Sequence, residues 1–482
     1  MLRWRLSFRP RFSSMSDHPS SSPDKSLASL MQALQATLAA TGFDVERDTL
    51  AVAYSGGLDS TVLLQVAAQW AQDSGGQVVA LHVHHGLSAN ADAWWAHAQA
   101  FCAQHGLPCA AERVQLAQVA DSGIEEAARL ARYAALGRLC RQHGAPLLLT
   151  AHHLDDQAET VLLQLLRGSG LAGMSGMDHC NTAPGLLGDA HTLVARPFLG
   201  VTRAQLEAVA RALALVWIED ESNQDPRYTR NALRHQVMPT LGQVFPGYQQ
   251  RLARAAGHAQ GAQELLREVA QQDLAQCRQD DHLLMPALRG LSEQRFLNLM
   301  RHWFALRGMR MPSAAWMQEM RSQLLQADVE AQLCVSHPDG EVHRYRERVF
   351  LAPRRIAPDE GASLSLRWEG QAQVRVAAFY GTLHFDPIAP DEGRPGLDAA
   401  WLRAQALLVC GRSGGERIKL GVNRPARSLK QQYQSADVPA WERPFLPLVW
   451  AGETLLFAAG IGMDCAHLVT SGERIALRWQ PD

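Results

Sequence analysis

The sequence predicts an α/β protein whose main domain, residues 25–240, is a doubly wound parallel sheet. Short apolar runs alternate with stretches of helical periodicity from about residue 48 onward, which is typical of strands that alternate with helices. The chain has 482 residues, of which 47% are hydrophobic, so it can bury a large core over several domains of roughly 100–200 residues. No run of about 18 apolar residues occurs, and no membrane span is expected.

The strands and helices of this sheet can be assigned in chain order. The expected strands are residues 49–54, 77–83, 109–114, 146–153 and 192–196, and the expected helices are residues 60–72, 90–105, 123–142, 156–167 and 203–214. Two helix starts have the spacing of a capping box, Ser122 with Glu125 and Thr202 with Gln205. Because strands alternate with helices, they should be parallel, with helices on both faces and ligands beyond the carboxyl ends.

The rest of the chain is expected to form further parts. Residues 241–355 are typical of a mainly helical domain that ends in a hairpin, residues 356–394 of a connector with short strands, and residues 395–482 of a small α+β domain. Residues 1–24 are rich in Arg, Ser and Pro and are expected to be disordered. They are either a leader of transit-peptide composition or sequence upstream of a true start at Met15.

Charge and cysteine content restrict the class of protein. The formal net charge is −2, which does not indicate a general nucleic-acid binder, so any polyanion site must be local. The 8 cysteines include no Cys-x-x-Cys pair, which argues against a zinc ribbon and against a disulfide framework. Reduced thiols and a cytoplasmic location are expected.

The stretch "LAVAYSGGLDSTVLL", residues 50–64, leaves a strand through two glycines and enters a helix at once. Gly56 and Gly57 allow backbone N–H groups to converge, and a helix that starts near Asp59 adds its unpaired amides and the positive end of its dipole. An anion is therefore expected at Ser55–Ser60. The loop is not a Walker A motif, because it lacks the G-x-x-x-x-G-K-[ST] pattern. An ordinary capped turn is the alternative.

Histidines and acids follow two other strands. His82, His84 and His85 end the second strand, where a transition-metal site and ordinary packed or hydrogen-bonded histidines are both possible. After the strand near residue 150, Asp156 and Glu159 begin a helix and share one face of it. They could complement the helix dipole, or they could hold Mg²⁺ or a cationic substrate beside the phosphate site.

Several ordered motifs resemble a known family. "SGGLDS" resembles the PP-loop of the ATP pyrophosphatases. Together with it, "HVHHGL", "TAHHLDDQAET", "LLRGSGLAGMSGM", "RPFL" and "EDESNQDPRYTRNALRHQVMP" are similar to the tRNA(Ile)-lysidine synthetases. The resemblance covers about residues 48–240 and resumes at 412–450, which resemble the C-terminal domain of that family.

The resemblance implies a two-step reaction. The 2-carbonyl oxygen of the wobble cytidine in an isoleucine tRNA with a CAU anticodon attacks the α-phosphate of ATP, and free L-lysine then displaces AMP. The product is lysidine, which changes the codon that is read from AUG to AUA. ATP would bind to Ser55, Gly56, Gly57, Leu58, Asp59 and Ser60, with Asp59 as the catalytic residue on the Mg²⁺ side. Asp156 or Glu159 would bind the lysine ammonium and accept its proton.

Two basic groups are expected to bind the tRNA. Arg230 and Arg234 could hold anticodon phosphates or the adenylate, or they could be ordinary helix-surface arginines. In the C-terminal segment, Arg417, Lys419 and Arg424 are expected to contact the tRNA backbone away from the wobble base. A homodimer is one assembly that the resemblance allows.

Two other functions are open from the sequence. A tRNA cytidine thiolase would use the same adenylation, but it usually needs paired cysteines. A non-catalytic tRNA-binding protein would keep the fold alone, against which the intact "SGGLDS" and acidic helix start argue.

Overall fold

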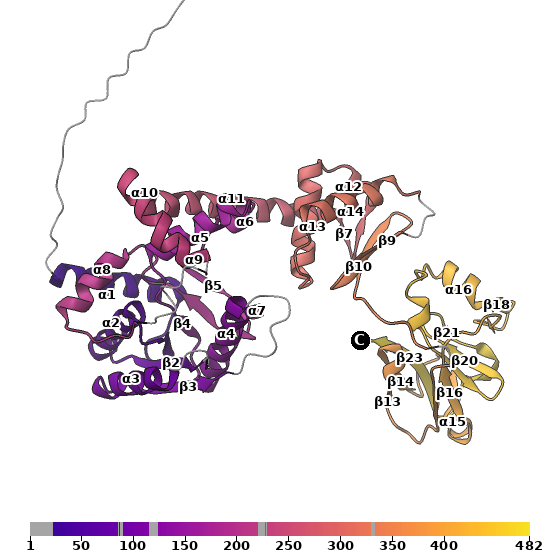
Figure 1. The fold of residues 1–482 in the computed structure, drawn as a ribbon. Helices are drawn as coiled ribbons and strands as arrows, with labels where there is room; N and C mark the ends of the chain where they lie inside the picture. The colour runs from indigo at the N-terminus through magenta and orange to yellow at the C-terminus, as the bar shows by residue number, and fades with distance from the viewer. Residues whose placement is uncertain are drawn as a thin grey trace, which may run out of the picture. The chain divides into compact units, whose positions relative to one another are not determined.

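The computed structural model forms two compact units, Met1–Arg267 and Glu268–Asp482 (Figure 1). It describes residues 23–84, 86, 90–114, 124–219, 227, 229–328, 333–359 and 361–482. The residues expected to form a disordered leader lie almost entirely outside this part of the chain. Among the described residues, no helix is long and apolar enough to cross a membrane.

The first unit is built on a six-stranded sheet in the order β3-β2-β1-β4-β6-β5. The strands are β1 (Thr49–Ala53), β2 (Gln77–His84), β3 (Cys109–Arg113), β4 (Leu147–Leu149), β5 (Cys180–Thr182) and β6 (Leu193–Ala195). All the pairings are parallel except that of β5 with β6. The predicted parallel sheet is confirmed. Strand β5 was not predicted, because its three residues, Cys-Asn-Thr, carry no apolar pattern.

Helices cover both faces of this sheet, as the doubly wound fold requires. The helices are α1 (Pro23–Thr41), α2 (Leu58–Ser74), α3 (Ala91–Gln104), α4 (Ile124–Gln142), α5 (Leu154–Leu166), α6 (Leu171–Met174), α7 (Pro184–Leu187) and α8 (Arg203–Ala212). Apolar residues of α1, α2, α3 and α8 form the core on one face, and those of α4 and α7 form it on the other (Figure 1). The Thr202 and Gln205 capping box is present at α8. The expected capping box at Ser122 lies outside the described residues.

Three more helices follow the sheet in the first unit. They are α9 (Thr229–Ala232), α10 (Met238–Val244) and the start of α11 (Tyr248–Cys277), and a single π-helical turn, η2 (Leu233–Val237), joins the first two. Leu233 and Met238 pack against Ala158 of α5. This packing holds the segment of Arg230 and Arg234 against the acidic helix.

The second unit begins with a mixed domain. Helices α12 (Met285–Arg289), α13 (Glu293–Leu306) and α14 (Ala314–Gln326) pack with a five-stranded sheet. Its strands are β7 (Arg278–Gln279), β8 (His282–Leu284), β9 (Leu333–His337), β10 (Gly340–Tyr345) and β11 (Arg348–Ala352), of which β9 and β10 form the expected hairpin. Trp303 and Phe304 of α13 are core residues with 2% and 0% exposure.

The C-terminal part of the second unit consists of two five-stranded sheets and a short hairpin. One sheet contains β12 (Ser363–Leu366), β16 (Leu407–Cys410), β19 (Leu448–Ala451), β20 (Thr454–Ala458) and β21 (Gly462–Met463). The other contains β13 (Gln373–Val376), β14 (Gly381–Ile388), β15 (Gly396–Asp398), β22 (Leu468–Val469) and β23 (Arg474–Pro481). Strands β17 (Arg417–Ile418) and β18 (Arg427–Ser428) pair with each other, and the helices are α15 (Ala399–Ala404) and α16 (Leu429–Ser435). Residues 356–394, expected as a connector, therefore contribute strands to the C-terminal sheets.

Arg474, in β23, joins the loops at one end of the sheet that contains β14, β15 and β22. Its side chain is 1% exposed, and its guanidinium donates hydrogen bonds to the backbone carbonyls of Ala389, Pro390, Glu392, Arg394 and Thr470. Replacing it removes the buried, charged donor of these hydrogen bonds. The acceptors lie on exposed residues that water can reach, but hydrogen bonds of a charged group are worth about 1.5–3 kcal/mol each. We expect Arg474→Met to lower the unfolding free energy of this domain by about 3 kcal/mol or more in urea titrations. Arg478→Met is the matched control, since Arg478 makes a half-exposed ion pair with Asp386. Its replacement should change the unfolding free energy by less than about 1 kcal/mol.

Candidate functional site

The loop between β1 and α2 forms a tight turn at the carboxyl end of the sheet. Gly56 has φ +86°, which favours glycine, and a Cβ there would lie 2.9 Å from the Ile218 side chain. Gly57 is the N-cap of α2 and has no side chain that could cap this helix end. The Oγ atoms of Ser55 and Ser60 lie 3.0 Å apart. The loop therefore offers hydroxyl groups and the first amides of a 17-residue helix to an anion.

The predicted ATP-binding residues do not all contribute in the same way. Leu58 is 6% exposed and packs in the core of the sheet, so only its backbone can face a ligand. Ser60 donates a hydrogen bond to the Gly57 carbonyl over 3.0 Å, which fixes the turn. Asp59 follows as the acid in the first turn of α2.

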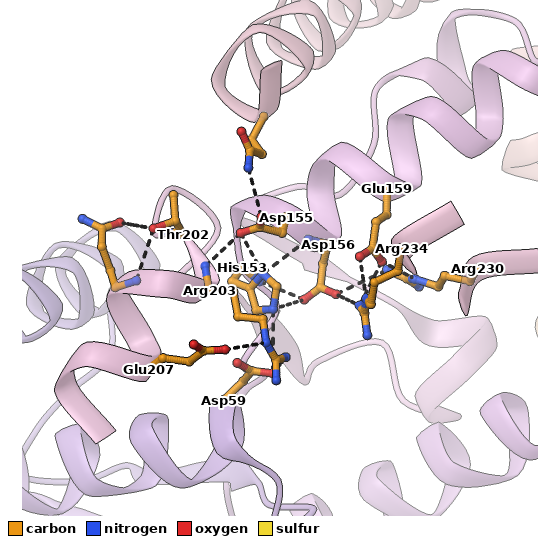
Figure 2. Close-up of polar contacts among 12 residues, drawn as sticks. Asp59, His153, Asp155, Asp156, Glu159, Thr202, Arg203, Glu207, Arg230 and Arg234 are labelled. Carbon is orange, nitrogen blue, oxygen red and sulfur yellow. Dashed lines mark hydrogen bonds and ion pairs between the residues drawn. The ribbon is translucent and has the colours of Figure 1, made fainter. Parts of the chain in front are cut away.

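Asp59 lies at the meeting point of several charged groups (Figure 2). Its Oδ2 accepts a hydrogen bond from Arg203 Nη1 over 3.1 Å and lies 3.7 Å from His153 Nε2. Its Oδ1 is buried and has no hydrogen-bond partner among the described residues. Burial raises the pKa of this carboxyl group, although His153 and Arg203 act in the opposite direction.

The start of α5 presents a histidine and further acids to Asp59. His153 is the N-cap of α5 and forms a capping box with Asp156. Its Nδ1 accepts the Asp156 N–H, so the proton belongs on Nε2, which lies 3.4 Å from Asp156 Oδ2. The carboxylate of Asp155 accepts the backbone N–H of Arg203 over 2.8 Å. The N-termini of α2, α5 and α8 therefore meet at this edge of the sheet.

The acids and arginines that the sequence singled out separately are paired with each other. Glu159 is 2% exposed, and its oxygens accept hydrogen bonds from Arg234 Nε over 2.6 Å and from Arg230 Nε over 3.1 Å. Asp156 Oδ1 accepts from Arg234 Nη2 over 3.0 Å (Figure 2). Burial alone would raise the pKa of Asp156, but His153, His152, Arg230 and Arg234 outweigh it and lower the pKa. Asp156 is therefore ionised at neutral pH.

Comparisons with known proteins agree with this arrangement. A PP-loop domain family matches residues 27–241, a TilS substrate binding domain family matches residues 283–350, and a TilS substrate C-terminal domain family matches residues 407–479. The chain is 45% identical to the tRNA(Ile)-lysidine synthase of Ralstonia nicotianae, over 90% of this chain and 93% of that protein. It is 42% identical to that of Burkholderia pseudomallei over 90% and 93%, and 38% identical to that of Escherichia coli O157:H7 over 89% and 96%. The chain belongs to the tRNA(Ile)-lysidine synthase family.

Two residues of this candidate site were not assigned a role from the sequence. Arg203 is the first residue of α8, and His153 caps α5. Both could have been predicted to lie near Asp59, because the helices that follow parallel strands all begin at the same edge of the sheet. His152, next to His153, is also in this region, and burial lowers its pKa to about 3.

The histidines at the end of β2 have ordinary partners. His82 Nδ1 lies 3.0 Å from the Tyr54 carbonyl oxygen, and its ring stacks on Trp95. His84 Nε2 lies 3.0 Å from Asp92 Oδ1. Within the described residues, the one grouping with the geometry of a metal site is elsewhere, at Cys334, Glu341 and His343. His85 lies outside the described residues.

Asp59 is the residue that fits Mg²⁺. Its unpartnered Oδ1 is an oxygen ligand of the kind that Mg²⁺ prefers, and such ions commonly bind through one or two carboxylates together with substrate phosphates. The β1–α2 loop also carries the hydroxyl oxygens of Ser55 and Ser60. The donor set is therefore compatible with a magnesium–triphosphate complex.

The basic segment at β17 and β18 is a separate surface. Glu416, its one acid, turns inward: its Oε1 accepts the N–H groups of Ser413 and Gly414, and these bonds lower its pKa although burial would raise it. Arg417 and Arg424 are exposed and Lys419 is half-buried, and no ion pair to any of them is present among the described residues. The positive charge of this segment is therefore not neutralised from within.

Proposed function

We propose that the chain uses ATP to attach lysine to the wobble cytidine of an isoleucine tRNA with a CAU anticodon, which forms lysidine. Relatives named tRNA(Ile)-lysidine synthase match it at 34–45% identity over about 90% of its length, and this observation carries the proposal. The PP-loop domain fits an adenylation, and the site beside it pairs two acids with two arginines. ATP is a substrate here.

In the first step, the cytidine O2 forms a bond to the α-phosphorus of ATP, and the bond to the pyrophosphate oxygen breaks. Negative charge builds on the departing pyrophosphate. The N-terminal amides of α2 and the hydroxyls of Ser55 and Ser60 are fixed before the reaction, so they can stabilise this charge without reorganisation. A magnesium ion at Asp59, when bound, supplies further neutralising charge.

In the second step, the lysine amine forms a bond to C2 of the cytidine, and the C2–O bond breaks to release AMP. Asp156 is the better anchor for the ammonium group, because its lowered pKa keeps it ionised. The same low pKa makes it a weak proton acceptor, so the proton that the amine loses passes to water or leaves with the phosphate of the departing AMP. Glu159 orients Arg230 and Arg234, whose guanidinium groups also lie beside Asp156.

One experiment tests this function directly. Isoleucine tRNA is incubated with the protein, ATP and lysine, and its nucleosides are analysed by mass spectrometry. Lysidine should appear only when ATP and lysine are both present. Methionine tRNA, which carries the same anticodon bases, is the control substrate and should stay unmodified.

The same assay separates the other candidate functions. A thiolase would release AMP with a sulfur donor and without lysine. A tRNA-binding protein without catalysis would bind the tRNA but release no AMP. The cytoplasmic location and a homodimer stay predictions from the sequence.

We further propose that Arg417, Lys419 and Arg424 contact the tRNA backbone away from the wobble base. Neutralising Arg417 and Lys419 together to Gln should weaken tRNA binding and flatten its salt dependence by roughly one unit of log–log slope per lost phosphate contact. Filter binding across a salt series measures both quantities, and ATP and lysine affinities should not change.

The matched control for this prediction is Arg403→Gln. Arg403 is exposed in the same domain but is paired with Glu473, so its loss should leave the slope unchanged. If the double variant keeps the wild-type slope and affinity, the segment has a folding role only, and tRNA selection lies elsewhere.

A further inference from the structure

Arg203 connects charged groups at the carboxyl edge of the sheet, although it belongs neither to the β1–α2 loop nor to the acid–arginine cluster. Its backbone N–H donates to Asp155 Oδ2 over 2.8 Å, its Nε to Glu207 Oε1 over 3.3 Å, and its Nη1 to Asp59 Oδ2 over 3.1 Å. Figure 2 shows it reaching from the start of α8 to Asp59, 144 residues earlier in the chain. The backbone and the side chain of Arg203 are therefore both held in place.

The contact with Asp59 distinguishes the two oxygens of that carboxylate. Oδ2 is engaged by Arg203, whereas Oδ1 is buried with no hydrogen-bond partner among the described residues. A guanidinium donates along fixed directions, and its second nitrogen is tied to Glu207, so it restricts rotation of the Asp59 carboxylate. Oδ1 is thereby the oxygen whose hydrogen-bonding capacity is unused among the described residues, and we assign it to the ligand.

We propose that Arg203 is a positioning residue for adenylation, which holds the Asp59 carboxylate so that its Oδ1 is presented to the magnesium–ATP complex. The inference rests on the proposed function and assigns the two chemical steps to different arginines. The described hydrogen bonds of Arg203 go to Asp59, Asp155 and Glu207. Those of Arg230 and Arg234 go to Asp156, Glu159 and Thr160. Loss of Arg203 should therefore impair the first step and spare the second.

A lysine at position 203 should replace part of this role. Arg203 contacts two carboxylates through two different nitrogens, while the ammonium of lysine is a single point charge that can keep one ion pair. A glutamine keeps neither. The series Arg203→Lys and Arg203→Gln thus separates a requirement for charge at Asp59 from a requirement for volume at the start of α8.

The test measures three quantities in each variant. Pyrophosphate release with tRNA and ATP, without lysine, reports adenylation; transfer of lysine to isolated adenylated tRNA reports the second step. Electron paramagnetic resonance measures the affinity for Mn²⁺ in the presence of a non-hydrolysable ATP analogue, and so tests the metal site without catalysis. Arg211→Gln is the matched control, because Arg211 is on the same helix, 76% exposed, and pairs with the same Glu207.

We expect Arg203→Gln to slow adenylation and to weaken Mn²⁺ binding by about 10- to 100-fold, as loss of a residue that orients a metal ligand commonly does. Lysine transfer should stay within about 3-fold of wild type, since the contacts of Asp156 and Glu159 with Arg230 and Arg234 are untouched. Arg203→Lys should recover part of the loss, and Arg211→Gln should behave as wild type.

Two results would overturn the proposal. One is wild-type adenylation and Mn²⁺ binding in Arg203→Gln. The other is an equal loss of both chemical steps with a lowered melting temperature, which would indicate a structural role for the start of α8. If the wild-type protein forms no lysidine, the proposed function fails, and the comparison of Mn²⁺ and nucleotide binding still decides whether Arg203 positions Asp59.

Discussion

Asp59→Ala should reduce pyrophosphate release by at least about 100-fold while the protein stays folded and binds tRNA normally. The substitution removes the one carboxylate at the start of α2, including the unpartnered Oδ1 that is available to a metal ion. Its effect on stability should be less than about 1 kcal/mol. Burial already disfavours the charged form of Asp59, and its partner Arg203 is 42% exposed and can be solvated instead.

The measurement is pyrophosphate release with a thermal melt of the same sample. Asp59→Asn, which keeps the shape of the side chain, should be equally inactive, because an amide cannot supply the missing charge. Asp73→Ala is the control, since Asp73 is exposed near the end of the same helix and bonds only to Gln69 among the described hydrogen bonds. Normal release in Asp59→Ala, or a collapsed melt, would show that the assignment of Asp59 is wrong.

The sequence predicted the sheet because strands and helices differ in the period of their apolar residues. Each predicted strand of the main sheet is present, and the parallel order follows from the helix between successive strands. Periodicity also explains why Ser55, Asp59 and Asp156 could be placed together, since the loops after parallel strands meet at one edge. Periodicity was a poorer guide to which helix residues are buried. Leu165 and Leu166 continue the apolar stripe of α5, yet they are 50% and 69% exposed.

The pairing of Glu159 with Arg230 and Arg234 could not be predicted in the same way. These arginines are 71 and 75 residues from Glu159 and follow the last strand of the sheet, so no rule of strand order places them. Their position depends on packing of Leu233 and Met238 against α5, and on the π-helical turn that includes Arg234. From sequence, an arginine on a helix has no preferred partner. Tertiary packing supplies the partner here.

This pairing sharpens what the amide variants of the two acids should do. Glu159→Gln and Asp156→Asn should each slow lysine transfer more than adenylation, so adenylated tRNA should accumulate. For the acid that binds the lysine ammonium, we expect transfer to fall by about 100-fold at low lysine, which is the loss of a charge-assisted contact of roughly 2–3 kcal/mol. Replacing the other acid should slow transfer less, because each arginine keeps one carboxylate partner.

The lysine dependence identifies which acid it is. The pKa of Asp156 is lowered, so it is a better ammonium anchor than a proton acceptor, and its loss should raise the KM for lysine more than it lowers kcat. The side chain of Glu159 is 3% exposed and contacts both Arg230 and Arg234. Its loss should lower kcat, because the two arginines would no longer be held in one orientation. Glu112→Gln, which loses an ion pair with the half-exposed Arg138, is the control. Equal loss of adenylation and transfer in both variants would place these acids on the metal side and would exclude a role in handling the lysine amine.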